Sequence, residues 1–404
     1  MVKMCSTYQT FVLYTELMAN PAEGVDGRTD KRIMNDVATN PPDGGSVEAI
    51  NHEASVWMKR GIARLEAGAP AELQEAIGDF DQAIALRCKL PLDANPIFRY
   101  GLAAGWMNRG DALTRLGSAE NLADAVRSYD AALETLRDLP VEANPLFRRR
   151  LAIAWSNRGL SLQAQNTAAA LLEAGRSFET ASAVLHGGNA AEIVDRDYLL
   201  AAAQMNHANA LVRGAPGGSP AQARVMAQQA VALADQAQLQ DLAMTEVRLK
   251  ARYILCQAIA QLLAPLTTTD PISDDLFAEA SDAVDNGLAL ARSWEQQGVT
   301  QFRSVAQDLF HFGARIYQMS QPHFLSEFLL ENLDPARSSS SFVGDPQIHA
   351  AALESIWRSF RQIQNTGAQS PHTPPYDELL KQLRDLRLVE DRLAELQQTC
   401  RVQD

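Results

Sequence analysis

The side chains best suited to chemistry are an arginine and an acid that recur together along the chain. In three places an arginine precedes a glycine, and an acid follows that arginine 21 residues later. The pairs are Arg60 with Asp81, Arg109 with Asp130, and Arg158 with Glu179. Where His207 replaces the arginine, Gln228 replaces the acid, so base and acid disappear together. This pattern predicts ion pairs inside each repeat that fix helix register, in preference to a ligand clamp.

Signatures of catalysis and of metal binding are missing from the sequence. The seven histidines are scattered, and none has a partner at metal-ligand spacing. The cysteines, Cys5, Cys88, Cys256 and Cys400, match neither CxxC nor a zinc spacing. There is no phosphate-binding loop and no HExxH, GxSxG or GxGxxG motif. We therefore expect a protein that is not an enzyme, without a metal or a cofactor.

The charge and the hydropathy of the chain restrict its partners. The net charge is −13 and the pI about 5.1, which argues against nucleic acid, because such binding depends on Lys and Arg at phosphates. Anionic membrane surfaces are disfavoured for the same reason. No stretch approaches the roughly 20 apolar residues of a membrane span, and the dispersed cysteines fit a reducing compartment. These features predict a cytoplasmic location.

A longer pattern carries the arginines. A Trp-x-x-Arg-Gly motif recurs every 49 residues, starting at Trp57, Trp106 and Trp155. An aromatic residue follows each copy at the same distance, at Phe80, Tyr129 and Phe178. A period of this size indicates stacked helical units that bury their apolar faces on one another. We expect the tryptophans to anchor the core and the motif glycines to let helices approach closely.

Helix start and stop signals keep the same register. Asn95 and Asn144 each precede a proline, a pair typical of a helix N-terminus, and Ser46 holds the equivalent place before the first motif. The first helix of each repeat should run through the tryptophan motif to a stop such as Gly68 or Gly117. A helical pair is expected at 240–264 and 274–296, a further pair within 297–332, and two helices at about 346–365 and 376–400.

The Trp, Gly, Ala and aromatic positions resemble those of the tetratricopeptide repeat (TPR), whose unit has 34 residues in two antiparallel helices. This chain differs in its longer unit and in the arginine where that family usually has leucine. The resemblance implies an all-α, right-handed solenoid of antiparallel helix pairs with a C-terminal helical appendage. The expected domains are a leader and flexible linker (1–45), TPR-like repeats (46–237), degenerate helical pairs (238–333), and a Ser-rich loop with C-terminal helices (334–404).

By resemblance, the first helix of each repeat lines a concave groove that binds a partner protein. The residues implied are Met58, Ile62, Leu65, Met107, Asp111, Thr114, Ser156, Leu160, Gln163, Met205, Asn209 and Val212. Methionine and aliphatic side chains suit an apolar or helical segment, although the chain's own tails are an alternative occupant. The predicted function is a non-catalytic adaptor or scaffold; the alternative is a regulatory or accessory subunit of a stable enzyme complex.

The 376–400 segment has leucines at helical spacing over two heptads, too few to define a coiled coil. Capping of the last repeat is the default expectation. Self-association or docking on a partner through this helix are the alternatives.

Overall fold

The computed structural model describes residues 46–238, 240–264, 272–320, 328 and 332. Every regular element within them is helical, so the all-α prediction is confirmed for the described residues. Contacts within the chain divide it into two units, Met1–Gly218 and Ser219–Asp404. The expected domain boundaries stay predictions, as do the helices at 346–365 and 376–400, which lie outside the described residues.

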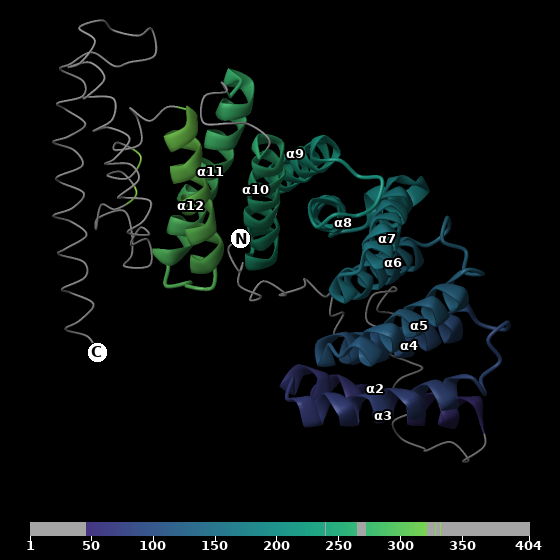
Figure 1. Ribbon diagram of the computed structural model, residues 1–404. Coiled ribbons are helices and arrows are strands. Elements are labelled where there is room, and N and C mark those ends of the chain that lie inside the picture. Colours follow the sequence, from purple (N-terminus) through teal and green to yellow (C-terminus); the bar gives the residue numbers. More distant parts are fainter. Residues whose placement is uncertain (1–45, 239, 265–271, 321–327, 329–331, 333–404) are drawn as a thin grey trace, which may run out of the picture. The chain divides into compact units, whose positions relative to one another are not determined.

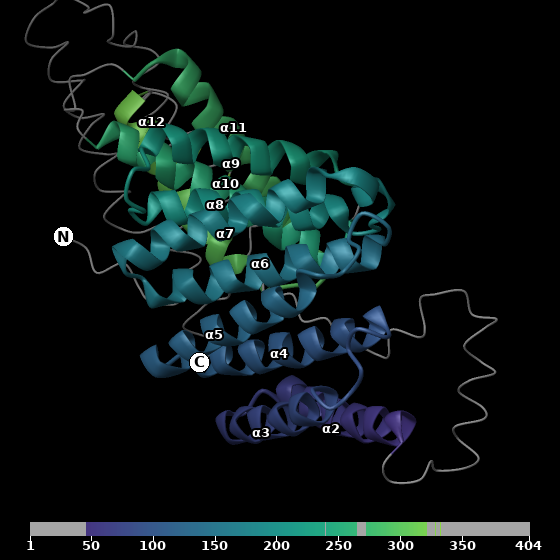
Figure 2. The ribbon, with the colours of Figure 1, turned by 90° about the vertical axis from the view of Figure 1, so that its right-hand side faces the viewer.

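The first unit is built of helix pairs that follow one another along the chain (Figure 1). Its helices are α2 (Val47–Ala67), α3 (Pro70–Arg87), α4 (Pro96–Leu116), α5 (Ala119–Leu136), α6 (Pro145–Gln165), α7 (Ala168–His186) and α8 (Arg196–Val212), with the short 3₁₀ helix η2 (Gly188–Glu192) before α8. Only two residues join α2 to α3, α4 to α5 and α6 to α7, which folds each pair into a helical hairpin. Each helix also packs on the next, an arrangement consistent with a helical repeat (Figure 2).

The predicted helix ends are confirmed. The side chains of Ser46, Asn95 and Asn144 accept hydrogen bonds from the first-turn amides of α2, α4 and α6, which satisfies donors that have no helical partner. Gly68 and Gly117 end α2 and α4 with φ of 72°. Asn166 ends α6 with φ of 52°. Asparagine suits this position because it tolerates the left-handed conformation better than most side chains.

Close contact between a glycine and an aromatic ring holds each pair together. The rings of Phe80, Tyr129 and Phe178 are fully buried, and each lies against the motif glycine of its own pair, Gly61, Gly110 or Gly159. A Cβ atom at these glycines would come within 2.5–2.7 Å of a ring carbon, well inside van der Waals contact. The expected close approach at the motif glycines is therefore confirmed.

The second unit contains α9 (Pro220–Gln236), α10 (Leu242–Leu263), α11 (Asp274–Glu295) and α12 (Arg303–Ser320). Consecutive helices pack together, and α10 also contacts α12. The helices expected at 240–264 and 274–296 are confirmed, and α12 provides one helix of the pair expected within 297–332, most of whose remaining residues lie outside those described. Because α9 belongs to this unit, the end of the expected repeat region 46–237, which contains α8 and α9, is divided between the units.

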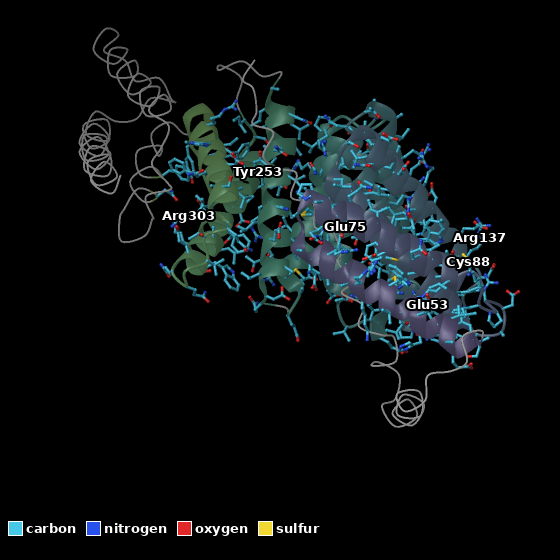
Figure 3. All side chains as sticks on the ribbon, turned by 90° about the horizontal axis from the view of Figure 1, so that it is seen from below. Glu53, Glu75, Cys88, Arg137, Tyr253 and Arg303 are labelled. Carbon is cyan, nitrogen blue, oxygen red and sulfur yellow. The ribbon has the colours of Figure 1, made fainter. Side chains whose placement is uncertain are left out.

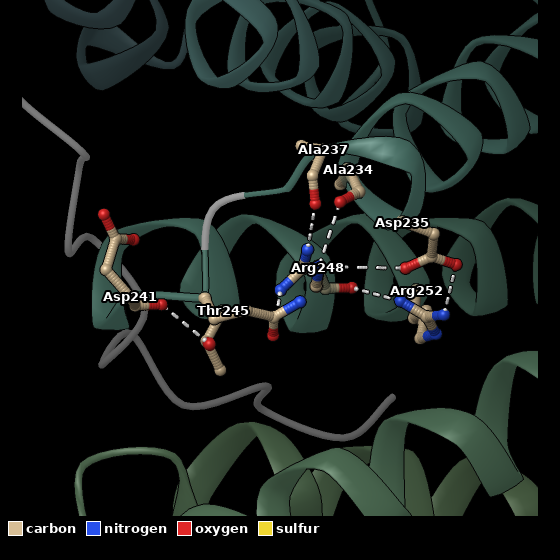
Figure 4. A network of polar contacts seen from close by, with 8 residues as sticks. Ala234, Asp235, Ala237, Asp241, Thr245, Arg248 and Arg252 are labelled. Carbon is tan, nitrogen blue, oxygen red and sulfur yellow. Dashed lines mark hydrogen bonds and ion pairs between the residues drawn. The ribbon is translucent and has the colours of Figure 1, made fainter. Parts of the chain in front are cut away.

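A buried arginine joins α10 to the end of α9 (Figure 4). Arg248 donates hydrogen bonds to the carbonyls of Ala234 and Ala237, each 2.9 Å long. Carbonyls at a helix C-terminus lack intrahelical donors and attract positive charge. One turn further along α10, Arg252 pairs with Asp235 at 2.6 Å. Arginine thus acts as a connector between neighbouring helices.

We predict that Gly61→Ala destabilises the protein by roughly 1–3 kcal/mol, because the new methyl group must displace the buried Phe80 ring. Gly78→Ala in α3 is the matched control, since a Cβ there meets nothing within 4 Å. That change should stabilise the helix by about 0.5–1 kcal/mol. Urea unfolding of both variants checks the pair, and equal effects would contradict the proposed contact.

Candidate functional site

The repeated arginines reach back to the preceding helix pair. Arg109 on α4 binds Asp81 on α3, and Arg158 on α6 binds Asp130 on α5, each through Nε to Oδ1 at 2.7 Å. The prediction of ion pairs within one repeat is therefore wrong: Arg109 does not pair with Asp130, nor Arg158 with Glu179. A first helix lies against the second helix of the pair before it, so the acid 28 residues upstream is the one that faces the arginine.

The same arginines also bind the second helix of their own pair, through a different residue. Arg109 donates to Ser128 at 2.7 Å, and Arg158 donates to Ser177 at 2.9 Å. In the first pair this place is held by Asp79, which binds Arg60 at 2.5 Å. The predicted Arg60–Asp81 pair is thus also wrong. The described part of the chain contains no helix pair before α2, and the first pair supplies the acid itself.

His207 on α8 replaces the arginine in the fourth motif. Its ring lies next to Gly175 on α7, and burial lowers its pKa while the nearby Glu179 raises it. The residue at this motif position therefore still interacts with the acid 28 residues upstream. The net pKa shift is downward, which favours the neutral ring and weakens the charge pairing at the last helix of this unit.

The repeated tryptophans are half-buried rather than enclosed in the core. The guanidinium of Arg60 lies 4.0 Å from the ring centre of Trp57, and that of Arg158 lies 5.8 Å from the ring centre of Trp155. Such stacking covers the ring with a cation that is already held by an acid. The tryptophans accordingly belong to the arginine network as well as to the helix packing. By contrast, charged residues such as Glu53 on α2 and Glu75 on α3 lie at the exposed surface of the first pair (Figure 3).

Most of the predicted groove residues are buried between helices. Those enclosed are Met58, Leu65, Met107, Asp111, Thr114, Ser156, Leu160, Gln163 and Met205, while Ile62, Asn209 and Val212 are half-buried. The expectation that the nine line an open groove is therefore wrong. The first helices of successive pairs contact each other directly, as in the 2.7 Å contact between Thr114 and Ser161.

A polar cluster lies at the contact of α4, α5 and α6. Asp111 is 2% exposed and accepts hydrogen bonds from the Tyr129 hydroxyl and, at 3.2 Å, from the Asn157 amide. Burial raises the pKa of Asp111 to about 7, although Tyr129, Arg115 and Asn157 act in the opposite direction. Burial and the adjacent Asp111 also raise the pKa of Tyr129 well above its usual value.

Next to this cluster runs a row of buried asparagines, Asn108, Asn157 and Asn206, which we call the asparagine row. Each holds the place before the arginine or histidine of its motif, and each is at most 5% exposed. Each also has one side-chain atom without a hydrogen-bond partner in the described structure: Nδ2 of Asn108 and Asn206, and Oδ1 of Asn157. Sequence reasoning missed this row, although its spacing is that of the tryptophan motif. The signal that could have revealed it is a polar residue repeated on a helix face that is buried against neighbouring helices.

Within the described ranges, no cluster of three or more His, Cys, Asp or Glu could hold a metal ion. None of the described helices is long and apolar enough to cross a membrane. No protein-family model matches the sequence, and a comparison with curated proteins finds no significant match. The class that the described structure supports is an all-helical protein with helical-repeat-like packing.

We predict, from a double-mutant cycle on thermal unfolding, that Arg158 and Asp130 are coupled by roughly 0.2–1 kcal/mol. The pair is half-exposed, which limits its strength. The matched cycle between Arg109 and Asp130 should give no coupling, since Arg109 binds Asp81. Coupling of Asp130 to Arg109, without coupling to Arg158, would contradict this assignment and support the ion pair within one repeat.

We also predict that stability falls as pH rises from about 4 to about 7 through Asp111. The folded pKa of about 7 exceeds the unfolded value of about 3.9. The unfolded chain therefore releases this proton at lower pH, and rising pH lowers its free energy relative to that of the folded protein. The contribution reaches about 4 kcal/mol and is constant above the folded pKa. Asp111→Asn should flatten this part of the pH profile of urea unfolding. A parallel profile in the variant would show that Asp111 does not titrate abnormally.

Proposed function

We propose that the protein is a TPR-like, right-handed solenoid with a 49-residue period that serves as a non-catalytic adaptor or scaffold and binds a segment of another protein. The similar contacts of successive helix pairs support this reading: the same glycine–aromatic and arginine–acid contacts recur. Arrays of this kind present equivalent side chains at regular intervals, which suits a partner that is itself regular.

The asparagine row is the observation that carries the proposal. A buried polar atom without a hydrogen bond costs about 1–3 kcal/mol, and native structures rarely keep such groups without a reason. Three of them at one motif position are a repeated cost to folding. These amides are at most 5% exposed, so a partner reaches them only if the neighbouring first helices separate. We propose that binding opens this contact and supplies the missing donors and acceptors, which makes these amides the proposed contact points.

The chemistry of the row favours an extended polypeptide. A carboxamide has a donor and an acceptor, the same groups that a peptide backbone offers. Neighbouring packed helices lie about 8–10 Å apart, and an extended strand advances about 3.3 Å per residue. A strand that crosses the first helices would therefore meet one asparagine about every third residue. This mode depends on backbone groups and places few demands on the partner's sequence.

An apolar or helical partner segment fits the structure less well. Such a segment needs exposed apolar side chains, whereas Met58, Met107, Leu160 and Met205 are at most 5% exposed. These side chains gain nothing further from a partner, because their transfer from water is already complete. The asparagines are enclosed to the same degree, and they differ in that their burial leaves an atom without a hydrogen bond.

The remaining expectations are part of the same proposal: a protein partner, no nucleic acid, no membrane, no cofactor and a cytoplasmic location. Self-association through the 376–400 helix concerns residues outside those described. The alternative function, an accessory subunit of an enzyme complex, differs in stoichiometry, since a subunit is recovered with one partner in constant ratio.

We predict that Asn108→Ala with Asn206→Ala weakens partner binding while leaving the protein as stable as the wild type, or more stable by up to about 1 kcal/mol, because each change removes an unsatisfied amide. Each lost amide contact of about 1.4 kcal/mol lowers affinity about tenfold. The measurement is a tagged pull-down from the native host with quantitative mass spectrometry, alongside thermal unfolding.

Asn121→Ala on α5 is the matched control, since Asn121 lies outside the row. Equal recovery of the partner by wild type and double variant would reject the row as the contact. A clear loss of stability in the double variant would instead assign the asparagines a structural role. A constant one-to-one ratio with a single enzyme would favour the subunit alternative.

A further inference from the structure

The three members of the asparagine row do not leave the same side-chain atom without a hydrogen bond. Asn108 and Asn206 each have an unpartnered Nδ2, a donor, whereas Asn157 has an unpartnered Oδ1, an acceptor. The reason lies in Asp111, which draws the Nδ2 of Asn157 toward its own Oδ1 at 3.2 Å. The middle carboxamide is thus oriented by a neighbouring carboxyl group.

The orientation depends on the proton of that carboxyl group. An ionised carboxylate can only accept hydrogen bonds, so it must face the NH₂ side of an amide. A protonated carboxyl has one O–H to donate, and its hydrogen-bearing oxygen can still accept from Tyr129. The protonated form therefore favours the carbonyl side of Asn157, which a rotation of the carboxamide by half a turn supplies.

We propose that protonation of Asp111 reverses the carboxamide of Asn157 and changes the asparagine row from donor–acceptor–donor to three donors. This inference rests on the proposed function for its consequence, a pH-dependent choice of the partner groups that the row accepts. In the ionised state the middle position takes a backbone N–H, and in the protonated state it takes a backbone carbonyl. The row then reads the backbone of a partner strand differently on either side of the transition.

The surroundings of Asp111 allow both states. The titratable and charged groups that act on it are Tyr129 from α5 and Arg115 from its own helix, and Asn157 from α6 is neutral. The nearby Thr114 and Ser161 are hydroxyls that already bond to helix carbonyls. Burial outweighs these partners and brings the pKa of Asp111 to about 7, so both forms are populated near neutral pH.

The test follows the side-chain amide signals of Asn157 by NMR in full-length protein labelled with ¹⁵N-asparagine, over pH 5 to 8.5. The expected result is a shift of both Asn157 amide protons with a midpoint near pH 7. The amide signals of Asn108 are the internal control and should not move with that midpoint. In Asp111→Asn, which removes the titrating carboxyl group, the Asn157 signals should not change with pH.

Two outcomes would overturn the inference. One is an Asn157 amide that does not respond while the ¹³C signal of the Asp111 carboxyl titrates; the other is a titration of Asn157 that persists in Asp111→Asn. Tyr129→Phe is a second variant in case Asp111→Asn fails to fold. Loss of the hydroxyl removes a hydrogen-bond donor to the ionised carboxylate and should move the midpoint upward. An unchanged midpoint also counts against the inference.

No partner is needed for these measurements, so they stand apart from the pull-down. A reversal of Asn157 with no recovered partner would reject the proposed function and keep the switch. A recovered partner with a static Asn157 would do the opposite.

Discussion

The close approach of two helices at a glycine is the constraint on which the first unit depends. Phe80, Tyr129 and Phe178 occupy the space that a side chain on the facing helix would need, so the crossing point of each pair is fixed by the absence of one methyl group. Glycine costs about 1 kcal/mol in a helix interior relative to alanine, and the fully buried ring more than offsets this. Once the crossing point is fixed, the residues one turn along the helix have fixed neighbours, and the arginines can find defined partners.

Arginine then connects what the glycines bring together. Arg109 and Arg158 bridge two pairs by binding a serine ahead and an acid behind, and Arg248 does comparable work at a helix end in the second unit. The planar guanidinium can serve several acceptors at once, which the point charge of lysine cannot do with the same geometry. These half-exposed contacts add little free energy individually. Their role is to set which helix faces which.

The helices were predictable because their signals are local. Ser46, Asn95 and Gly68 mark helix ends through their own backbone neighbours, and the 49-residue recurrence of the motif identified the contacting positions without a structure. The partners of the arginines were not predictable in the same way: the acid 21 residues downstream and the acid 28 residues upstream are both on a neighbouring helix, and one sequence cannot distinguish them. Burial of the predicted groove residues depends on direct packing of successive first helices, a tertiary feature that helical periodicity does not contain.

The asparagine row places unpartnered polar atoms inside the helix packing, at a cost to the stability of the fold. Packing alone would place apolar residues at positions 108, 157 and 206, as it does at Ala103, Ala152 and Ala201 nearby. An amide there leaves an unpaired atom in each helix, and Asp111 adds a carboxyl group whose ionised form is disfavoured by burial. Neither the asparagines nor the aspartate improves the fold. Alanine in place of each asparagine, or asparagine in place of Asp111, would remove the cost. The simplest physical account is that these groups are arranged for hydrogen bonds that the isolated chain does not supply. In α4 and α6 the cost is tolerable because a glycine–aromatic contact, at Gly110 or Gly159, stabilises the same helix two residues away.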